Sequence, residues 1–323
     1  MSKKVFVCRP IPEDGILALR KKGFQVEVNP EDRVLSKEEL KEKVAGCDAV
    51  LALLSDKIDG EVLDSAGKQL KIVANYAVGY DNIDVPAAKE RKVYVSNTPG
   101  VLTEAVAEHA FALLLAVAKR IVEADRFVRE GKFKQWEPKG FLGPQIWGKT
   151  IGIIGLGRIG SFVAQIARGG FNMEILYYDV KKNEEFEMRF SAKYHEVPTL
   201  LKNSDFVTLH VPLMPATHHL IGAKELGQMK EGAILINTSR GPIVDERALV
   251  EGLKAKKIAG AGIDVYEHEP QLTPGLADLP NIVMTPHTAS ATHEARSAMS
   301  RIAAENIIAV LEGKQPPNPV LVK

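Results

Sequence analysis

The chain has 323 residues, of which 45% are apolar and 26% are charged, and its formal net charge is +1. This length favours two domains over one hydrophobic core, and the near-neutral charge gives no electrostatic argument for binding nucleic acid or an anionic membrane. No apolar run approaches the ~20 residues that a membrane-spanning helix needs. The first residues lead directly into an apolar strand-like run and leave no room for a signal peptide, so we expect a cytoplasmic protein.

Short apolar runs alternate with helical patterns along the chain, which is typical of parallel α/β architecture. The first series of predicted strands is Val5–Cys8, Phe24–Val28, Ala49–Leu53, Lys71–Ala74 and Val93–Val95, with helical spacing at 11–22 and 36–45. The second series is Thr150–Ile154, Ile175–Tyr178, Phe206–His210, Ala233–Asn237, Ala259–Ile263 and Ile282–Met284. Each series is long enough to build a sheet of its own.

A break in regular structure separates the two series. Pro99 and Gly100 precede an apolar helical run at residues 103–120. Another helical pattern, from about Thr292 to Leu311, follows the last strand and either crosses back to the first domain or packs on the second. We predict an α/β fold of two Rossmann-like, doubly wound parallel sheets. Residues 1–98 and 291–323 would form a substrate-binding lid domain and residues 99–290 a dinucleotide-binding domain, with the active site in the cleft between them.

A glycine-rich turn follows the predicted strand Thr150–Ile154. Gly155 permits a tight turn, Gly157 lets the backbone approach a pyrophosphate, and Gly160 lets the next helix pack closely on the strand. Arg158 and Ile159 lie between these glycines, at the helix start where unpaired N–H groups and the helix dipole favour an anion. The turn therefore predicts a dinucleotide site.

An acidic residue at the end of the next strand strengthens this prediction. Asp179 lies roughly 20 residues beyond Gly160, where a carboxylate accepts hydrogen bonds from the adenosine ribose. A carboxylate also repels a 2′-phosphate, so we expect NAD, with NADP less favoured. Lys181 and Lys182 follow directly and partly offset that repulsion.

Three chemically reactive side chains lie just past strand ends of the second series: Arg240, Glu269 and His287. Ligands of doubly wound sheets gather beyond the carboxyl ends of the strands. An arginine offers a planar fork to a carboxylate, a histidine donates a proton to a forming alkoxide, and a carboxylate keeps the imidazole charged. Taken singly, each residue also has an ordinary structural explanation. Arg240 could be a surface charge, Glu269 one of several acids in a loop, and His287 a hydrogen-bonded loop histidine.

The remaining histidines and the cysteines suggest no second reactive site. His109 lies in the apolar helical run and is expected to make a packing or interdomain hydrogen bond. His218 and His219 have no carboxylate or cysteine at ligand spacing, so we expect no metal. Cys8 and Cys47 lack zinc or redox spacing and are expected to be buried and inert.

Seven segments in order along nearly the whole chain carry a resemblance to a known family: residues 74–84, 97–104, 148–160, 210–213, 237–241, 262–265 and 286–292. Together they resemble the D-2-hydroxyacid dehydrogenases, and most closely the glyoxylate/hydroxypyruvate reductase branch. The resemblance implies NAD(P)H-dependent reduction of a small 2-keto acid, glyoxylate or hydroxypyruvate, to the D-2-hydroxy acid. NADP-using members of this branch carry a small residue followed by arginine-rich sequence where this chain has Asp179.

The resemblance also implies a role for each matching residue. Arg240 would hold the substrate carboxylate and carbonyl, His287 would be the acid/base, and Glu269 would orient and charge His287. Backbone N–H groups at Val78 and Gly79 would bind the substrate carboxylate, and Leu54 would line the pocket for its C3 end. The implied cofactor contacts are Thr103, Val211, Pro212, Thr238, Asp264 and Ser290.

The family is typically a homodimer with its interface on an arm of the cofactor domain. Trp136 matches an arm position that either approaches the second subunit's active site or anchors the interface. A competing hypothesis is an NADH-sensing regulatory protein, because corepressors of this fold keep the arginine, glutamate and histidine. The chain begins and ends close to predicted elements, without disordered extensions, which favours the enzyme.

Overall fold

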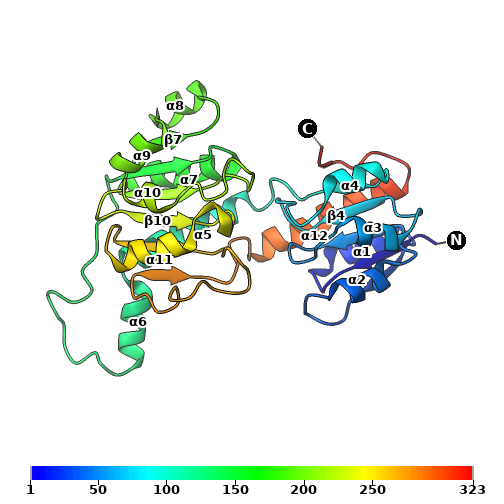
Figure 1. The fold of residues 1–323 in the computed structure, drawn as a ribbon, viewed down its shortest axis with the longest axis horizontal. Helices are drawn as coiled ribbons and strands as arrows, with labels where there is room; N and C mark the ends of the chain where they lie inside the picture. Colours follow the sequence, from blue (N-terminus) through cyan, green and yellow to red (C-terminus); the bar gives the residue numbers. More distant parts are fainter. Residues whose placement is uncertain (1, 322–323) are drawn as a thin grey trace. The chain divides into compact units, whose positions relative to one another are not determined.

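The computed structural model describes residues 2–321 (Figure 1), so Met1 and the last two residues of the predicted lid domain lie outside it. The described chain forms two compact units. One contains the residues up to Leu102 together with those from Ala291 onward, and the other is Thr103–Ser290. Each unit has one parallel sheet.

The first unit has a five-stranded sheet in the order β2-β1-β3-β4-β5. This is the flavodoxin-like order of doubly wound sheets, with a reversal of strand order beside β1. The strands are β1 (Lys4–Val7), β2 (Gln25–Val28), β3 (Ala49–Ala52), β4 (Ile72–Asn75) and β5 (Tyr94–Ser96). The helices are α1 (Glu13–Lys21), α2 (Lys37–Val44), α3 (Gly60–Ala66), α4 (Val85–Glu90) and α12 (His293–Leu311).

The C-terminal helix α12 crosses back to the first unit and packs on α1. A Cβ on Gly15 would overlap the backbone carbonyl of Ser300, so only glycine allows this approach of the two helices. The Gly15 N–H donates a hydrogen bond to Ser300 Oγ at 3.0 Å. This contact explains why residues far apart in sequence share one unit.

The second unit has a seven-stranded sheet in the order β12-β11-β10-β9-β6-β7-β8. The order is that of a dinucleotide-binding sheet with one further edge strand, and it reverses between β6 and β9. The strands are β6 (Thr150–Ile154), β7 (Glu174–Tyr178), β8 (Lys193–Tyr194), β9 (Phe206–Leu209), β10 (Ile234–Asn237), β11 (Gly260–Ile263) and β12 (Ile282–Met284). The helices are α5 (Thr103–Ala118), α6 (Ile121–Arg129), α7 (Arg158–Phe171), α8 (Glu184–Phe190), α9 (Val197–Asn203), α10 (Ala223–Leu226), α11 (Glu246–Lys254) and the 3-10 turn η1 (Gly241–Ile243).

Strand alternation gives this sheet an apolar layer on each face. Ile151 and Ile153 of β6 face a cluster that includes α5 and α7, whereas Ile154 faces a cluster that includes α9 and α11. Both faces of a parallel sheet are covered in this way, which is why its strands are apolar throughout. The predicted fold class of two Rossmann-like parallel sheets is confirmed.

The predicted elements differ from the observed ones mainly at their ends. The helix predicted at 103–120 ends at Ala118, because Arg120 adopts a left-handed backbone with φ of 53° and α6 begins after it. Cys8 and Cys47 are buried, as expected. Within residues 2–321, no helix is long and apolar enough to cross a membrane.

Candidate active site

The glycine-rich turn connects β6 to α7 as the sequence predicts. Gly155 has a positive φ of 96°, and a Cβ there would lie 2.6 Å from the carbonyl oxygen of His210. A Cβ on Gly160 would overlap the carbonyl oxygen of Gly155. Gly157 differs, because a Cβ added to it would have no neighbouring atom within 4 Å. Arg158 and Ile159 form the first turn of α7, whose leading N–H groups have no partner within the helix.

The residues around this turn fit a dinucleotide. The space in front of Gly157 is open, so a phosphate can approach the backbone at the positive end of α7. At the end of the nearby strand β10, the hydroxyl of Thr238 is buried and has no hydrogen-bond partner among residues 2–321. A buried polar atom without a partner is unusual in a folded protein, and a bound cofactor would supply the missing partner.

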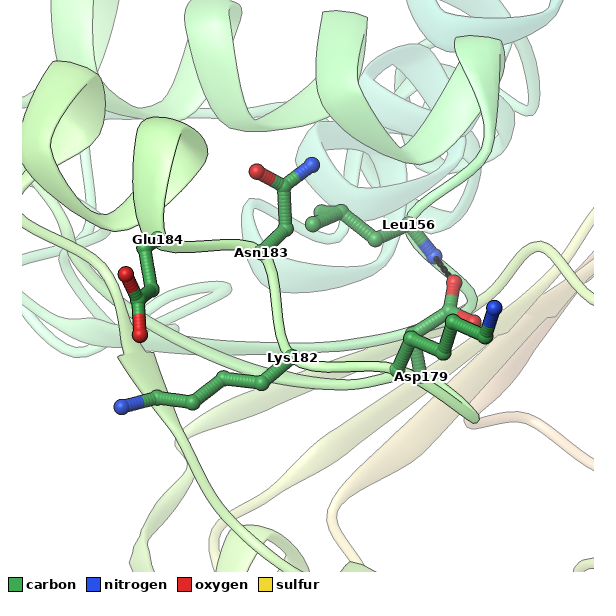
Figure 2. Close-up of a pocket in the computed structure, with 6 residues that line it drawn as sticks. Leu156, Asp179, Lys182, Asn183 and Glu184 are labelled. Carbon is green, nitrogen blue, oxygen red and sulfur yellow. Dashed lines mark hydrogen bonds between the residues drawn. The ribbon is translucent and has the colours of Figure 1, made fainter.

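Asp179 lies beside the glycine turn, in a pocket of about 490 Å³ (Figure 2). Its Oδ2 accepts a hydrogen bond from the Leu156 N–H at 2.6 Å, and its Oδ1 accepts one from the Val180 N–H at 2.7 Å. In Figure 2, Lys182 extends away from Asp179, and its Nζ lies 3.3 Å from Glu187 Oε2. Lys181 also lines the pocket.

Other predicted cofactor residues lie at the carboxyl edge of the same sheet or at the ends of this unit. Val211 and Pro212 follow β9, Thr103 begins α5, and Ser290 ends the unit. His210 precedes Val211, and its Nε2 lies 2.8 Å from Thr208 Oγ1. Burial lowers the pKa of His210 to about 3, so its imidazole is neutral at pH 7.

Glu269 and His287 are brought together in the second unit. His287 Nδ1 lies 2.9 Å from Glu269 Oε2, and because an ionised carboxylate can only accept, the imidazole nitrogen donates. The other carboxylate oxygen, Oε1, accepts the Tyr266 N–H at 2.9 Å. No hydrogen bond of His287 Nε2 is found within residues 2–321, so that nitrogen can serve a substrate.

The loop that carries His287 is built around Asp264. His287 has a left-handed φ of 54°, and its N–H donates to the Asp264 carbonyl oxygen at 2.9 Å. The Asp264 carboxylate accepts the N–H groups of Thr288 at 2.7 Å and Ala289 at 2.8 Å. Asp264 is fully buried. The sequence predicts Asp264 as a cofactor contact, and the structure shows in addition that it holds the loop that carries His287.

A histidine on α5 completes this network. His109 Nε2 lies 2.9 Å from Thr285 Oγ1, which donates to Asp264 Oδ1 at 2.6 Å. Burial raises the pKa of Asp264, but hydrogen bonds from His109, Thr285 and backbone N–H groups outweigh it and leave the pKa below its ordinary value. The hydrogen bond expected of His109 therefore lies within the second unit.

Arg240 is half-buried and lies between the end of β10 and the start of η1. Strand β10 is the neighbour of β11 in the sheet. Its carbonyl oxygen accepts the Asn237 Nδ2–H at 2.9 Å, and its Nη1 donates to the Ser239 carbonyl at 2.8 Å. A Cβ on Gly241 would overlap the Tyr266 backbone, so the Arg240 turn packs directly on the segment that leads to Glu269. The structure thus joins the segments of all three predicted catalytic residues.

The predicted substrate residues of the first unit follow its two central strands. Leu54 lies beyond β3, and Val78 and Gly79 lie beyond β4. The carbonyl of Val78 accepts the Asn97 Nδ2–H, and that of Gly79 accepts the Asn75 Nδ2–H, both at 2.7 Å. Neither Val78 nor Gly79 donates its N–H to another described residue. Two fixed N–H groups without partners suit an anionic ligand.

Sequence reasoning did not identify Tyr266 as part of this site. Its hydroxyl donates to the Thr285 carbonyl at 2.9 Å while its N–H holds Glu269, so it ties together the two loops of the His–Glu pair. Burial raises the pKa of Tyr266 to about 12, with nearby carboxylates adding to the shift. Its position three residues before Glu269 was the only signal available in the sequence. Among residues 2–321 no group of His, Cys, Asp or Glu side chains forms a metal site.

Two doubly wound sheets, an open glycine turn followed by an acidic residue, and a histidine–glutamate pair at the sheet edge together define an oxidoreductase that binds a nicotinamide dinucleotide. The model of the family described as D-isomer specific 2-hydroxyacid dehydrogenase, NAD binding domain, matches residues 111–289. The chain belongs to this family.

Similar proteins agree with this assignment. The chain is 52% identical to a glyoxylate reductase of Korarchaeum cryptofilum over 98% of this chain and 96% of that protein. It is 32% identical to the solved glyoxylate reductase of Paecilomyes thermophila, with a TM-score of 0.88 over 99% of this chain and 98% of the other. An NADPH-dependent glyoxylate/hydroxypyruvate reductase of Sinorhizobium meliloti is 30% identical, with a TM-score of 0.85 over 99% and 97% of the two chains.

These comparisons confirm the predicted family, the oxidoreductase class and NAD as a supported cofactor. The hypothesis of a regulatory binding protein is not favoured, because the similar proteins are named as reductases. The predicted roles of individual residues, the domain assignments and the position of the active site between the domains stay predictions.

Proposed function

We propose that this protein reduces glyoxylate and hydroxypyruvate to the corresponding D-2-hydroxy acids with NADH. The observation that carries the proposal is the His287–Glu269 pair, held at 2.9 Å at the carboxyl edge of the dinucleotide-type sheet with Nε2 of the imidazole open. Relatives named glyoxylate reductase, about 50% identical over nearly the whole chain, support the choice of substrate.

Arg240, Val78, Gly79 and Leu54 are proposed to bind the keto acid. The guanidinium of Arg240 would pair with the carboxylate and contact the C2 carbonyl oxygen, a geometry that suits its planar fork. The unpartnered N–H groups of Val78 and Gly79 would bind the same carboxylate. Leu54 would lie against the C3 end, where glyoxylate and hydroxypyruvate differ.

His287 is proposed to be the proton donor of the reduction. The reduced nicotinamide supplies the hydride when the cofactor is bound. The proton on His287 Nε2 then passes to the C2 oxygen of the substrate, whose negative charge is stabilised by Arg240. Glu269, hydrogen-bonded to Nδ1, favours the charged imidazolium before the transfer and fixes the orientation of the ring.

The cofactor is proposed to occupy the edge of the second unit. Gly155, Gly157, Arg158, Ile159 and Gly160 would hold the pyrophosphate, and Asp179 would bind the adenosine ribose. Val211 and Pro212 would flank the adenine, and Ser290 would lie beside the nicotinamide. Thr103 and Asp264 would lie near a phosphate or the nicotinamide amide, and Thr238 would be a further cofactor contact. Residues 99–290 would thus act as the cofactor domain, and residues 1–98 with 291–323 as the substrate-binding domain. We propose NAD as the preferred cofactor.

We further propose a cytoplasmic homodimer. The segment 121–147 exposes a series of large apolar side chains, which is a frequent feature of subunit interfaces. They are Ile121, Val122, Val128, Phe133, Trp136, Leu142 and Trp147. The cytoplasmic location rests on the sequence alone.

The test of the proposed function is NADH oxidation by the purified protein with glyoxylate, hydroxypyruvate and pyruvate. We expect turnover on the first two, and a His287→Ala variant should lose at least about 100-fold in kcat because general acid catalysis is removed. Its NADH affinity, measured by fluorescence titration, should stay close to that of the wild type. His218→Ala is the matched control, since His218 is exposed and has no part in the proposed reaction. Equal kcat values for the two variants would refute the assignment of His287.

A further inference from the structure

A second histidine–carboxylate pair lies in the same unit as the His287–Glu269 pair. His219 Nε2 is 2.8 Å from Glu267 Oε1, and because the carboxylate only accepts, His219 donates. The side chains are 36% and 15% exposed, respectively, so the bond is only partly accessible to water. The proposed reaction assigns no role to this pair.

A buried glutamate joins the pair to the rest of the unit. Glu246, the first residue of α11, accepts the Glu267 N–H at 2.7 Å, and its own N–H donates to Glu267 Oε2 at 3.3 Å. Thr273 Oγ1 donates to the other oxygen of Glu246 at 2.6 Å. Carboxylates that are shielded from water need donors on their oxygens. His219, Glu246, Glu267 and Thr273 are called the His219 cluster below.

The His219 cluster binds three strand-end segments together. The N–H of His219 donates to the Pro242 carbonyl at 2.8 Å, and Ile221 and Val244 form a parallel bridge beside it. The segment after β9 is thus paired with the segment after β10. Glu267 adds the segment after β11 through its bonds to His219 and Glu246.

Both proposed catalytic segments adjoin this cluster without belonging to it. Arg240 immediately precedes Gly241, whose missing side chain lets the turn lie on the Tyr266–Glu267 backbone. Glu269 lies two residues after Glu267 and is held by the N–H of Tyr266. A change in the position of Glu267 would therefore be transmitted through one or two residues to both Arg240 and Glu269.

We propose that His219 is a positioning residue: its hydrogen bond to Glu267 fixes the 266–269 segment on the 240–242 turn and so sets Arg240 relative to the Glu269–His287 pair. The inference rests on the proposed function of those three residues. Because displacements of about 1 Å at a reacting centre cost large factors in rate, loss of this bond should be measurable in catalysis.

The experiment compares His219→Ala, His219→Gln and His218→Ala. The amide nitrogen of glutamine replaces the Nε2–H donor, whereas alanine has none. Both His219 variants lose the imidazole ring, and both place a non-glycine residue at the same left-handed backbone position, with φ of 51°. A difference in activity between them therefore reports the loss of the hydrogen-bond donor alone. His218 is the matched control because it is exposed and its ring centroid lies 4.0 Å from that of His219.

We expect His219→Ala to lower kcat/KM for glyoxylate about tenfold, through both a higher KM and a lower kcat. The Kd for NADH should be unchanged, and His219→Gln should restore most of the loss. Equal activity of His219→Ala and His218→Ala, or equal losses in both His219 variants, would overturn the proposal. If the wild type itself turns over no keto acid, the proposed function fails instead.

Amide hydrogen exchange supplies a readout that does not depend on activity. His219→Ala should speed exchange in segments 240–243 and 266–269 relative to the wild type, while His219→Gln and His218→Ala should not. Unchanged exchange in His219→Ala would overturn the positioning role whatever the substrate of the enzyme is.

Discussion

At the scale of single residues, Asp179 is the residue that we propose to set the choice of cofactor. Both of its oxygens are already held by N–H groups, of Leu156 and Val180, so the carboxylate needs no rearrangement to receive a ribose hydroxyl. A 2′-phosphate brought to the same place would meet a fixed negative charge. Lys182 offers little compensation because its ammonium group pairs with Glu187. These contacts support the proposed preference for NAD.

Replacing this carboxylate should relax the preference. We predict that Asp179→Ser raises the ratio of kcat/KM with NADPH to that with NADH about tenfold, equivalent to about 1.4 kcal/mol. Steady-state kinetics with both cofactors measures the ratio. Glu184→Gln, which removes another negative charge from the lining of the same pocket, is the control. If it changes the ratio as much as Asp179→Ser does, net charge rather than the placement of Asp179 sets the preference.

The residues at strand ends could be predicted from the sequence, whereas their supporting contacts could not. Arg240, Glu269 and His287 each follow an apolar run, so a parallel sheet places them on one edge. The bond of His219 to Glu267 spans 48 residues. It exists only because β9, β10 and β11 are neighbours, and no local pattern encodes that order. For the same reason, the sequence alone does not reveal that Asp264 supports the loop of His287.

At the scale of elements, two glycines of one turn have different surroundings. Gly160 lies in the first turn of α7 and leaves no space for a Cβ against the Gly155 carbonyl. Gly157 precedes the helix and has open space in front of it. Gly160 thus serves the packing of α7 on the strand, and Gly157 is proposed to serve the approach of a ligand.

Alanine substitutions should separate these two roles. Gly160→Ala should destabilise the fold by about 1–3 kcal/mol, because the obstructing atom is backbone and cannot turn aside. Gly157→Ala should cost less than about 1 kcal/mol, as a change of helix cap, yet weaken NADH binding about tenfold or more since its methyl group occupies the ligand's space. Denaturant unfolding and NADH fluorescence titration measure the two effects. The reverse pattern, with a stable Gly160→Ala and unimpaired NADH binding by Gly157→Ala, would contradict this division.

Most of the strands and helices that the sequence predicts end within about one residue of the observed ones, whereas several further elements were not predicted, among them α6 and α11 of the second unit. Strands β6 and β12 match their predicted bounds, because each is a short apolar run with clear limits. The edge strand β8 has only two residues and the helix α4 only six, too few for a periodic signal. Such elements are stabilised by their neighbours rather than by their own sequence.

At the scale of the whole molecule, the chain divides into two units close to a change in composition. Pro99 and Gly100 predict a boundary after residue 98, but the first unit continues to Leu102. Asn97 donates its N–H to the Asn318 carbonyl and Thr98 donates to that of Ala77, so the segment before Pro99 is bound within this unit. The local change in composition at Pro99 and Gly100 therefore marks the neighbourhood of the boundary.

The apolar segment 121–147 bears on the state of the molecule in solution. Phe133 is 60% exposed and Trp136 is 80% exposed, and they lie in a segment that carries five further exposed apolar side chains. Leaving this much apolar surface in water is unfavourable by about 25 cal/mol per Å². Covering it with the same segment of a second copy would produce a symmetric interface, the commonest kind in homodimers.

We predict that the wild type sediments as a dimer and that the double variant Val128→Glu with Phe133→Glu sediments as a monomer, because carboxylates placed in such an interface must be desolvated without a partner. Sedimentation velocity over a range of concentrations measures both. Met188→Glu is the control, since Met188 is 80% exposed but lies on α8, outside the segment. A monomeric wild type would contradict the proposed dimer. A dimeric double variant would keep the dimer but move its interface elsewhere, and a monomeric Met188→Glu would place that interface at α8.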